Sequence, residues 1–273
     1  MVRVVLATLS REWSCSGPAG EDLLGWAWGN IMTYEMIDGT FRQTNLKNES
    51  DDYLAKREQL RLAEIELIKQ RERVAEIRRA LPQGAAITDY ELLEGPRALD
   101  GGDSPIRKVK ISELFSSPER PLVIYQLMFG KKQTKPCPMC TLWIDGYNGV
   151  AHHIAQNMDF AIVAAAEPIL LRAYARERGW HNLRLLSAGE SSFKYDLGGE
   201  NPDGGQDSAL NVFTKSADGT VRHSYTQHPK LAQDINERGI DLLTPVFNLM
   251  DVTPRGRGNW YPSLGYGTKA HGQ

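Results

Sequence analysis

The stretch that decides the fold runs from residue 122 to residue 140 and reads LVIYQLMFGKKQTKPCPMC. Its first part, Leu122 to Phe129, is a short apolar run behind Pro121, which is typical of a strand buried on both faces of a sheet. A proline suits the first turn of a helix because its missing N–H is not needed there, so Pro138 indicates a helix start. The stretch therefore predicts a buried strand, a loop that carries two cysteines, and a helix from Pro138 to about Asn157.

The segments that follow continue to alternate between strand and helix. An apolar run at 160–166 predicts a second buried strand, and 168–178 predicts a second helix that ends at Gly179. A short strand is expected at 183–186, and strands at 210–214 and 220–226 flank Asp218-Gly219, a strong hairpin signal. A closing helix is expected at 239–250. This order predicts an α/β sheet with helices packed on its faces.

Cys137 and Cys140 carry the candidate chemistry. At the start of a helix, free N–H groups and the positive end of the macrodipole stabilise a thiolate, so the pKa of Cys137 should fall and Cys137 should be the nucleophile. Lys135 would add positive potential. Cys140, one turn further and partly buried, should keep its proton until a mixed disulfide forms and then resolve it. A Cys-x-x-Cys pair beside a strand–helix–strand pattern is a redox signature.

Two other interpretations of the cysteine pair compete with redox chemistry. The two thiols fit a structural role as small buried groups. They also fit a zinc site completed by His152 and His153, but in a continuous helix His152 lies about 18 Å beyond Cys140, whereas zinc ligands sit ~2 Å from the metal. A helix break at Gly146 or Gly149 would relax that objection. We expect a redox pair with no metal and no cofactor.

Three further residues near the pair have two interpretations each. Asp145 is either a proton acceptor for Cys140 or, more commonly, a surface carboxylate. Tyr195 and Asp196 either line the cleft facing Cys137 or pack within a loop.

Composition narrows the class of protein. The chain has 273 residues, 41% hydrophobic and 24% charged, with a formal net charge of -2, which gives no electrostatic reason to expect nucleic acid or an anionic membrane as partner. No apolar run approaches the ~20 residues of a membrane span, and no convincing signal peptide is present. The three cysteines do not suit a disulfide-stapled secreted scaffold. We therefore expect a cytoplasmic protein.

A long charged helix is predicted at 51–82, ahead of the cysteine region. Tyr53, Leu60, Leu67, Val74 and Leu81 repeat every seven residues. We expect this stripe to be buried against the protein's own domain, and the alternative is a coiled coil that forms a homodimer. The predicted organisation is an N-terminal extension of unclear structure at 1–50, with 1 to about 31 poorly packed, the helix at 51–82, the main domain at 83–258 and a tail at 259–273.

From about Asp52 to Arg257 the sequence resembles a bacterial thioredoxin-like family catalogued as domain of unknown function 899. The resemblance is carried by the helix ending Arg79–Pro82, Met128-Phe129-Gly130, Cys137-Pro138-Met139-Cys140 with Trp143, Asp145, Gly146, Asn148 and Gly149, then Gly179-Trp180, Ser187–Asp196 and Asp251–Arg257. It implies a thioredoxin-like fold of the peroxiredoxin-like branch. It also implies a dithiol-disulfide oxidoreductase acting on a disulfide-containing protein or small molecule, with a thiol reductant.

Two other functions stay open. The first is a thiol peroxidase that uses Cys137, because peroxiredoxins carry a threonine three residues before the reactive cysteine and Thr134 stands there, although Gly130 replaces the proline that precedes it in peroxiredoxins. The second is a non-catalytic thioredoxin-like binding module.

Overall fold

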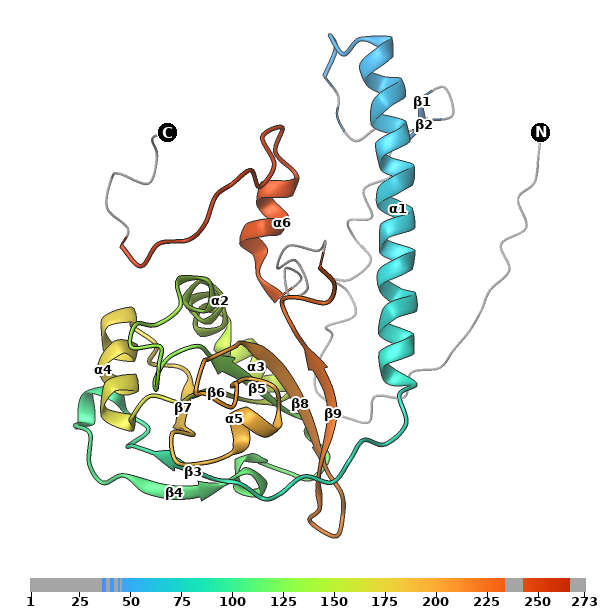
Figure 1. Ribbon diagram of the computed structural model, residues 1–273. Coiled ribbons are helices and arrows are strands. Elements are labelled where there is room, and N and C mark those ends of the chain that lie inside the picture. The colour runs from blue at the N-terminus through green and yellow to red at the C-terminus, as the bar shows by residue number, and fades with distance from the viewer. Residues whose placement is uncertain (1–35, 38–39, 42–43, 45, 234–242, 266–273) are drawn as a thin grey trace, which may run out of the picture. The chain divides into compact units, whose positions relative to one another are not determined.

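The computed structural model describes residues 36–37, 40–41, 44, 46–233 and 243–265 (Figure 1). They belong to two units, one ending at Val74 and the other beginning at Ala75, and each is described by itself. The expectation for residues 1 to about 31, the third cysteine, Cys15, and residues 239–242 of the expected closing helix lie outside the described residues.

The second unit is built on a seven-stranded sheet in the order β4-β3-β7-β6-β5-β8-β9. β5 pairs in parallel with β6, and β6 with β7, while the other neighbours are antiparallel. Every residue of β5 is buried, because strands cover both of its edges and helices cover both faces. The strands are β3 (Glu91–Glu94), β4 (Arg107–Lys110), β5 (Leu122–Leu127), β6 (Asp159–Ala164), β7 (Arg184–Ser187), β8 (Ala209–Lys215) and β9 (Val221–Gln227).

Two hydrophobic clusters cover the faces of this sheet. Tyr125 and Leu127 point to one face, where they pack with residues of α2, α4 and α6. Leu122 and Ile124 point to the other face, among residues of α5 and the 3-10 turn η2. This alternation follows from the two-residue period of a strand. The helices are α2 (Pro138–Gly149), α3 (Ala151–Asn157), α4 (Pro168–Arg178), α5 (Phe193–Asp196) and α6 (Pro245–Asp251), with 3-10 turns η1 (Leu99–Gly101) and η2 (Ile111–Leu114).

The predicted fold class is confirmed by this topology. Three parallel strands, β7-β6-β5, continue into the antiparallel hairpin β8–β9, and the cysteine pair follows β5 at the start of α2. The hairpin turns at Gly219, whose φ of 86° is in the left-handed region that favours glycine. The sheet is thioredoxin-like. It has the peroxiredoxin-like order, in which β7 follows β5 and β6 along the chain and lies beside β6.

Two details of the main domain differ from the prediction. The helix expected from Pro138 to about Asn157 is broken at Val150, whose φ of -114° and ψ of 15° separate α2 from α3 just after Gly149. The four-residue elements β3, β4 and α5 were not predicted. β3 and β4 nevertheless extend the sheet beyond β7.

The first unit contains a two-stranded ribbon of β1 (Met36–Ile37) and β2 (Thr40–Phe41), and most of the long helix α1 (Asp51–Arg79). The Ser50 hydroxyl accepts from the N–H of Tyr53 at 3.2 Å, which satisfies a free donor of the first turn. Charged pairs such as Arg61–Glu58, at 2.6 Å, follow the helix surface. No helix among the described residues is long and apolar enough to cross a membrane.

The seven-residue stripe is exposed in the first unit taken by itself, and its burial against the main domain stays a prediction. None of the residues of α1 is buried, and Leu60 and Leu67 are each 53% exposed. The period of seven correctly predicted the helix, but a helix this rich in charge also places apolar side chains in solvent contact beside long Lys and Arg stems.

An exposed Leu67 predicts that Leu67→Ala changes the free energy of unfolding by no more than about 0.5 kcal/mol, the usual limit for an exposed position. Leu186→Ala in β7, where the side chain is fully buried, should cost about 2–5 kcal/mol. Urea unfolding of both variants tests the contrast. A loss at Leu67 as large as that at Leu186 would show that α1 buries its stripe in solution.

Candidate functional site

A rigid loop joins β5 to the cysteine pair. The N–H of Cys137 donates to the carbonyl of Met128 at 3.1 Å, and Gly130 and Gln133 exchange two backbone hydrogen bonds at 2.8 and 2.9 Å. Gly130 has a φ of 109°, and a Cβ there would lie 2.2 Å from the backbone nitrogen of Ala166. Only glycine fits this approach, so the loop holds Cys137 against the end of the strand.

Cys137 is the N-cap residue of α2, as predicted from Pro138 at the next position. Its Sγ accepts from the N–H of Cys140 at 3.5 Å, and its side chain is 7% exposed. Hydrogen bonds lower the pKa of Cys137 to about 6, and the largest effect comes from the Cys140 thiol. Burial acts in the opposite direction and raises the pKa. The backbone N–H groups of Cys140 and Met139 and the Tyr261 hydroxyl lower the pKa further. A thiolate at Cys137 is the nucleophilic form of the residue.

Cys140 has the opposite character. It is 1% exposed, and burial, followed by the adjacent sulfur of Cys137, raises its pKa well above the ordinary value. Interactions of the Cys140 sulfur with Tyr125 and with the N–H of Met128 lower this pKa, but by less than burial and Cys137 raise it. The two thiols are reduced in the structure and form a chemically asymmetric pair.

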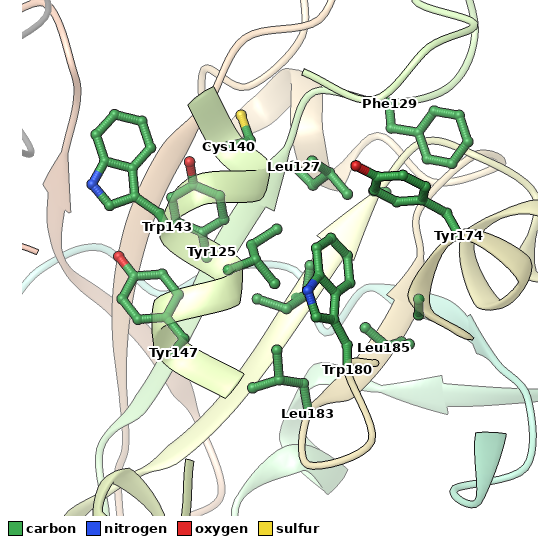
Figure 2. Close-up of a cluster of buried hydrophobic side chains, with 14 of the residues drawn as sticks. Tyr125, Leu127, Phe129, Cys140, Trp143, Tyr147, Tyr174, Trp180, Leu183 and Leu185 are labelled. Carbon is green, nitrogen blue, oxygen red and sulfur yellow. The ribbon is translucent and has the colours of Figure 1, made fainter. Parts of the chain in front are cut away.

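Aromatic rings form the wall behind Cys140 (Figure 2). Tyr125 lies 5.7 Å from Tyr147 and 6.4 Å from Trp143 between ring centroids. The polar atoms of all three rings are buried and have no hydrogen-bond partner of full geometry among the described residues. The Tyr125 hydroxyl does lie close enough to Cys140 to lower its pKa, and we treat this as a weak polar contact. The wall keeps water from Cys140, which favours the neutral thiol.

Other residues considered from the sequence do not join the pair. Lys135 is exposed, and the shift at Cys137 comes mainly from hydrogen bonds rather than from this charge. Asp145 accepts from Trp180 Nε1 at 2.7 Å and also pairs with Arg178, so it connects α2 to the end of α4 and is not directed to Cys140. Trp143 is buried in the core.

The residues weighed for a metal site or for the cleft also lie elsewhere. His152 and His153 stack on each other in α3, with ring centroids 4.1 Å apart. No group of three or more His, Cys, Asp or Glu side chains able to hold a metal ion occurs in the described part of the chain. Tyr195 is 50% exposed on α5. Asp196 is also exposed, and it accepts at 2.8 Å from the hydroxyl of Tyr90, which belongs to the cluster on the opposite sheet face.

Tyr261 was missed by sequence reasoning because it follows α6 in a segment with no periodic pattern. That segment packs locally: the Arg257 guanidinium lies 3.8 Å from the centre of the Phe247 ring, and Trp260 stacks edge-on against the same ring. The packing places the Tyr261 hydroxyl at Cys137, where it lowers the pKa of the thiol. Tyr261 therefore contributes to the site, although residues 259–273 were expected to form a tail.

Two surface cavities lie away from the cysteines. One, of about 280 Å³, is lined by residues including Tyr90 and Lys108, and the other, of about 660 Å³, opens beside Leu122, Asp159 and Arg184 at the start of the parallel strands. Neither is lined by Cys137 or Cys140. The reactive pair lies at the opposite end of β5, because it follows the last residue of that strand.

Alkylation by iodoacetamide should show the asymmetry of the pair directly. Because the pKa of Cys137 is lowered to about 6, its rate should rise through about pH 6 and level off above it. A free thiol would rise through about pH 8.5. Cys140 should stay unlabelled across this range. Peptide mapping by mass spectrometry assigns each rate, and faster labelling of Cys140 would reverse the proposed roles.

Comparison with known proteins gives a family but no curated relative. Residues 43–270 match the family described as "Bacterial protein of unknown function (DUF899)". No curated protein matches the chain.

Several solved structures are similar to the chain. Reduced Prx3 from Vibrio vulnificus, in complex with hydrogen peroxide, is 19% identical, covers 60% of this chain and 99% of its own, and has a TM-score of 0.39. AhpC from Mycobacterium tuberculosis is 14% identical, with coverage of 66% and 99% and a TM-score of 0.41. A protein from Burkholderia cenocepacia titled a putative thioredoxin reductase is 19% identical, with coverage of 54% and 86% and a TM-score of 0.38.

The family match extends over α1, the whole main sheet and the cysteine pair. It spans far more than half of the 273 residues and includes every motif on which the resemblance was based. The chain belongs to the bacterial family of unknown function DUF899.

Proposed function

We propose that this protein is a thiol–disulfide oxidoreductase in which Cys137 is the nucleophile and Cys140 the resolving cysteine. The observation that carries the proposal is the placement of two thiols one helical turn apart: Cys137 is the N-cap of α2 and its Sγ accepts from the N–H of Cys140, while Cys140 is 1% exposed. This placement lowers the pKa of Cys137 and raises that of Cys140. Two cysteines with a purely structural role do not require different pKa values. Disulfide exchange requires one cysteine to attack as a thiolate while the other stays protonated until the mixed disulfide has formed.

The reaction proceeds in two exchanges. The Cys137 thiolate attacks one sulfur of a substrate disulfide, a mixed disulfide forms, and the other substrate sulfur leaves with the electron pair and takes up a proton. Cys140 then attacks Cys137 Sγ, which releases the second substrate thiol and leaves a Cys137–Cys140 disulfide. An external thiol reductant returns both cysteines to the reduced state.

The substrate class is a disulfide-containing protein or small molecule, reached from the side of Cys137. Cys137 retains 7% exposure and Cys140 only 1%, so an incoming disulfide meets Cys137 first. We place the protein in the cytoplasm, where a reducing environment keeps such a pair available. A homodimer through the exposed apolar residues of α1 is part of the same proposal, and sedimentation equilibrium tests it.

Two assays on the full chain separate this function from the alternatives. Dithiothreitol-driven reduction of insulin or of oxidised glutathione should be accelerated by the wild type and not by Cys137→Ser. Peroxide consumption under the same reductant should be slow by comparison. Rapid peroxide consumption without disulfide exchange would favour the thiol peroxidase, and inactivity in both assays would favour a binding module.

A further inference from the structure

Lys194 is a buried lysine that the two-exchange scheme does not use. It lies on α5 and is completely buried, although lysine side chains are almost never fully buried without a partner. Its Nζ donates to the carbonyls of Leu127 at 3.3 Å and of Asp207 at 3.4 Å. Among the described residues it forms no ion pair with a carboxylate within 4 Å. Two neutral carbonyls do not neutralise the ammonium, so its positive charge can also stabilise a nearby anion.

One peptide group separates this ammonium from Cys140. The carbonyl of Leu127, at the end of β5, accepts from Lys194, and the N–H of the same peptide, which belongs to Met128, interacts with the Cys140 sulfur and lowers its pKa. In a trans peptide the carbonyl and the N–H point in opposite directions, so the ammonium and the sulfur lie at the two ends of one dipole. A cation at the carbonyl strengthens the N–H as a donor, and the low dielectric of the interior increases the effect.

The charges around Lys194 are consistent with this link. Burial lowers the pKa of Lys194 to about 8, while Cys140, Glu200 and Asp207 raise it and Lys131 opposes them. The lysine therefore keeps its charge near neutral pH. Glu200 pairs with Lys131, and Asp207 lies 3.2 Å from His228 Nε2, so each carboxylate has a side-chain partner other than Lys194.

We propose that Lys194 is the positioning residue of the resolving step, in which its ammonium stabilises the Cys140 thiolate through the Leu127–Met128 peptide. The inference rests on the proposed disulfide exchange. In the mixed disulfide Cys137 carries no charge, so its effect in raising the pKa of Cys140 is gone and the ammonium acts against burial alone. The Cys140 thiolate then forms a bond to Cys137 Sγ, the bond from Cys137 to the substrate sulfur breaks, and that sulfur takes the proton that Cys140 gave up. Lys194 keeps its own protons.

Dithiobis-nitrobenzoate resolves the two exchanges in time on the full-length protein. Attack by Cys137 releases the first coloured thiolate, and attack by Cys140 releases the second. In Lys194→Met the second phase should be about tenfold slower near neutral pH, with its pH midpoint about one unit higher, as expected for a one-unit rise in the pKa of Cys140. The first phase should be unchanged. Lys215→Met is the matched control, because Lys215 also donates to a backbone carbonyl, that of Ser112 at 3.0 Å.

The outcomes separate the two proposals. A normal first phase with an unshifted second phase overturns the role of Lys194 alone, whereas the absence of a fast first phase in the wild type overturns the proposed function.

Should Lys194→Met not fold, nuclear magnetic resonance of Cε-labelled lysines compares Cys137→Ser with Cys137→Ser/Cys140→Ser. Lys194 should hold its proton to a higher pH where Cys140 is retained, because coupling between two titrating groups is reciprocal. Identical titrations in the two variants would contradict the link.

Discussion

Cys137→Ser should reduce disulfide-exchange turnover by a factor of about 10³ or more, because a serine hydroxyl does not ionise where the thiolate of Cys137 does. The measurement is insulin or oxidised-glutathione reduction at saturating dithiothreitol. Cys140→Ser should behave differently. Its first exchange should proceed, and the protein should then accumulate as a mixed disulfide at Cys137 that mass spectrometry detects.

Cys15→Ser is the matched control for both variants, since it makes the same chemical change outside the pair, and it should retain wild-type turnover. Equal loss of activity in Cys137→Ser and Cys15→Ser would contradict the assignment. So would a mixed disulfide trapped at Cys140 in place of Cys137.

Arg172→Met should lower the free energy of unfolding by about 3–5 kcal/mol, because orphaned buried acceptors cost ~1–3 kcal/mol each. Arg172 on α4 is 3% exposed, and its guanidinium donates to Asp103 Oδ1 at 2.9 Å. It also donates to four backbone carbonyls, those of Pro96, Ala98, Leu99 and Gly102. Methionine fills a similar space without a donor, so these acceptors lose their common partner.

Urea denaturation measures the loss, with Arg107→Met as the matched control. The Arg107 side chain is 62% exposed and pairs with the buried Glu94 at 2.7 Å, and Glu94 also pairs with Arg184 and Arg97. Loss of the exposed Arg107 should therefore cost about 0–1 kcal/mol. The first phase with dithiobis-nitrobenzoate should persist in folded Arg172→Met, because no hydrogen bond joins Arg172 to either cysteine. Equal midpoints for the two arginine variants would show that Arg172 does not hold the segment from Pro96 to Asp103 to α4.

The sequence predicted the central strands and the position of the cysteines because those signals are local. A continuous apolar run predicts β5, Pro138 indicates the start of α2, and Asp218-Gly219 predicts the turn between β8 and β9. Each depends on residues within a few positions of one another. The low pKa of Cys137 was predicted in direction from the same local geometry.

Features that depend on distant segments were not predicted. In the sequence, nothing distinguishes Lys194 from a surface lysine. Its burial depends on contact with Leu127, which lies 67 positions earlier in the chain. Arg172 reads as a polar residue of an amphipathic helix, yet its partners are 69 to 76 positions away. The stripe on α1 has the same limit, because a period of seven predicts an apolar face without showing what covers it.

The measurement that tests the central claim most directly is a redox titration of the full-length protein in glutathione buffers, read by peptide mapping after the free thiols are trapped. The account predicts a reversible two-electron transition in which the oxidised form carries an intramolecular Cys137–Cys140 disulfide. Failure of that disulfide to form, with Cys137 ending as a stable glutathione adduct while Cys140 stays reduced, would contradict it.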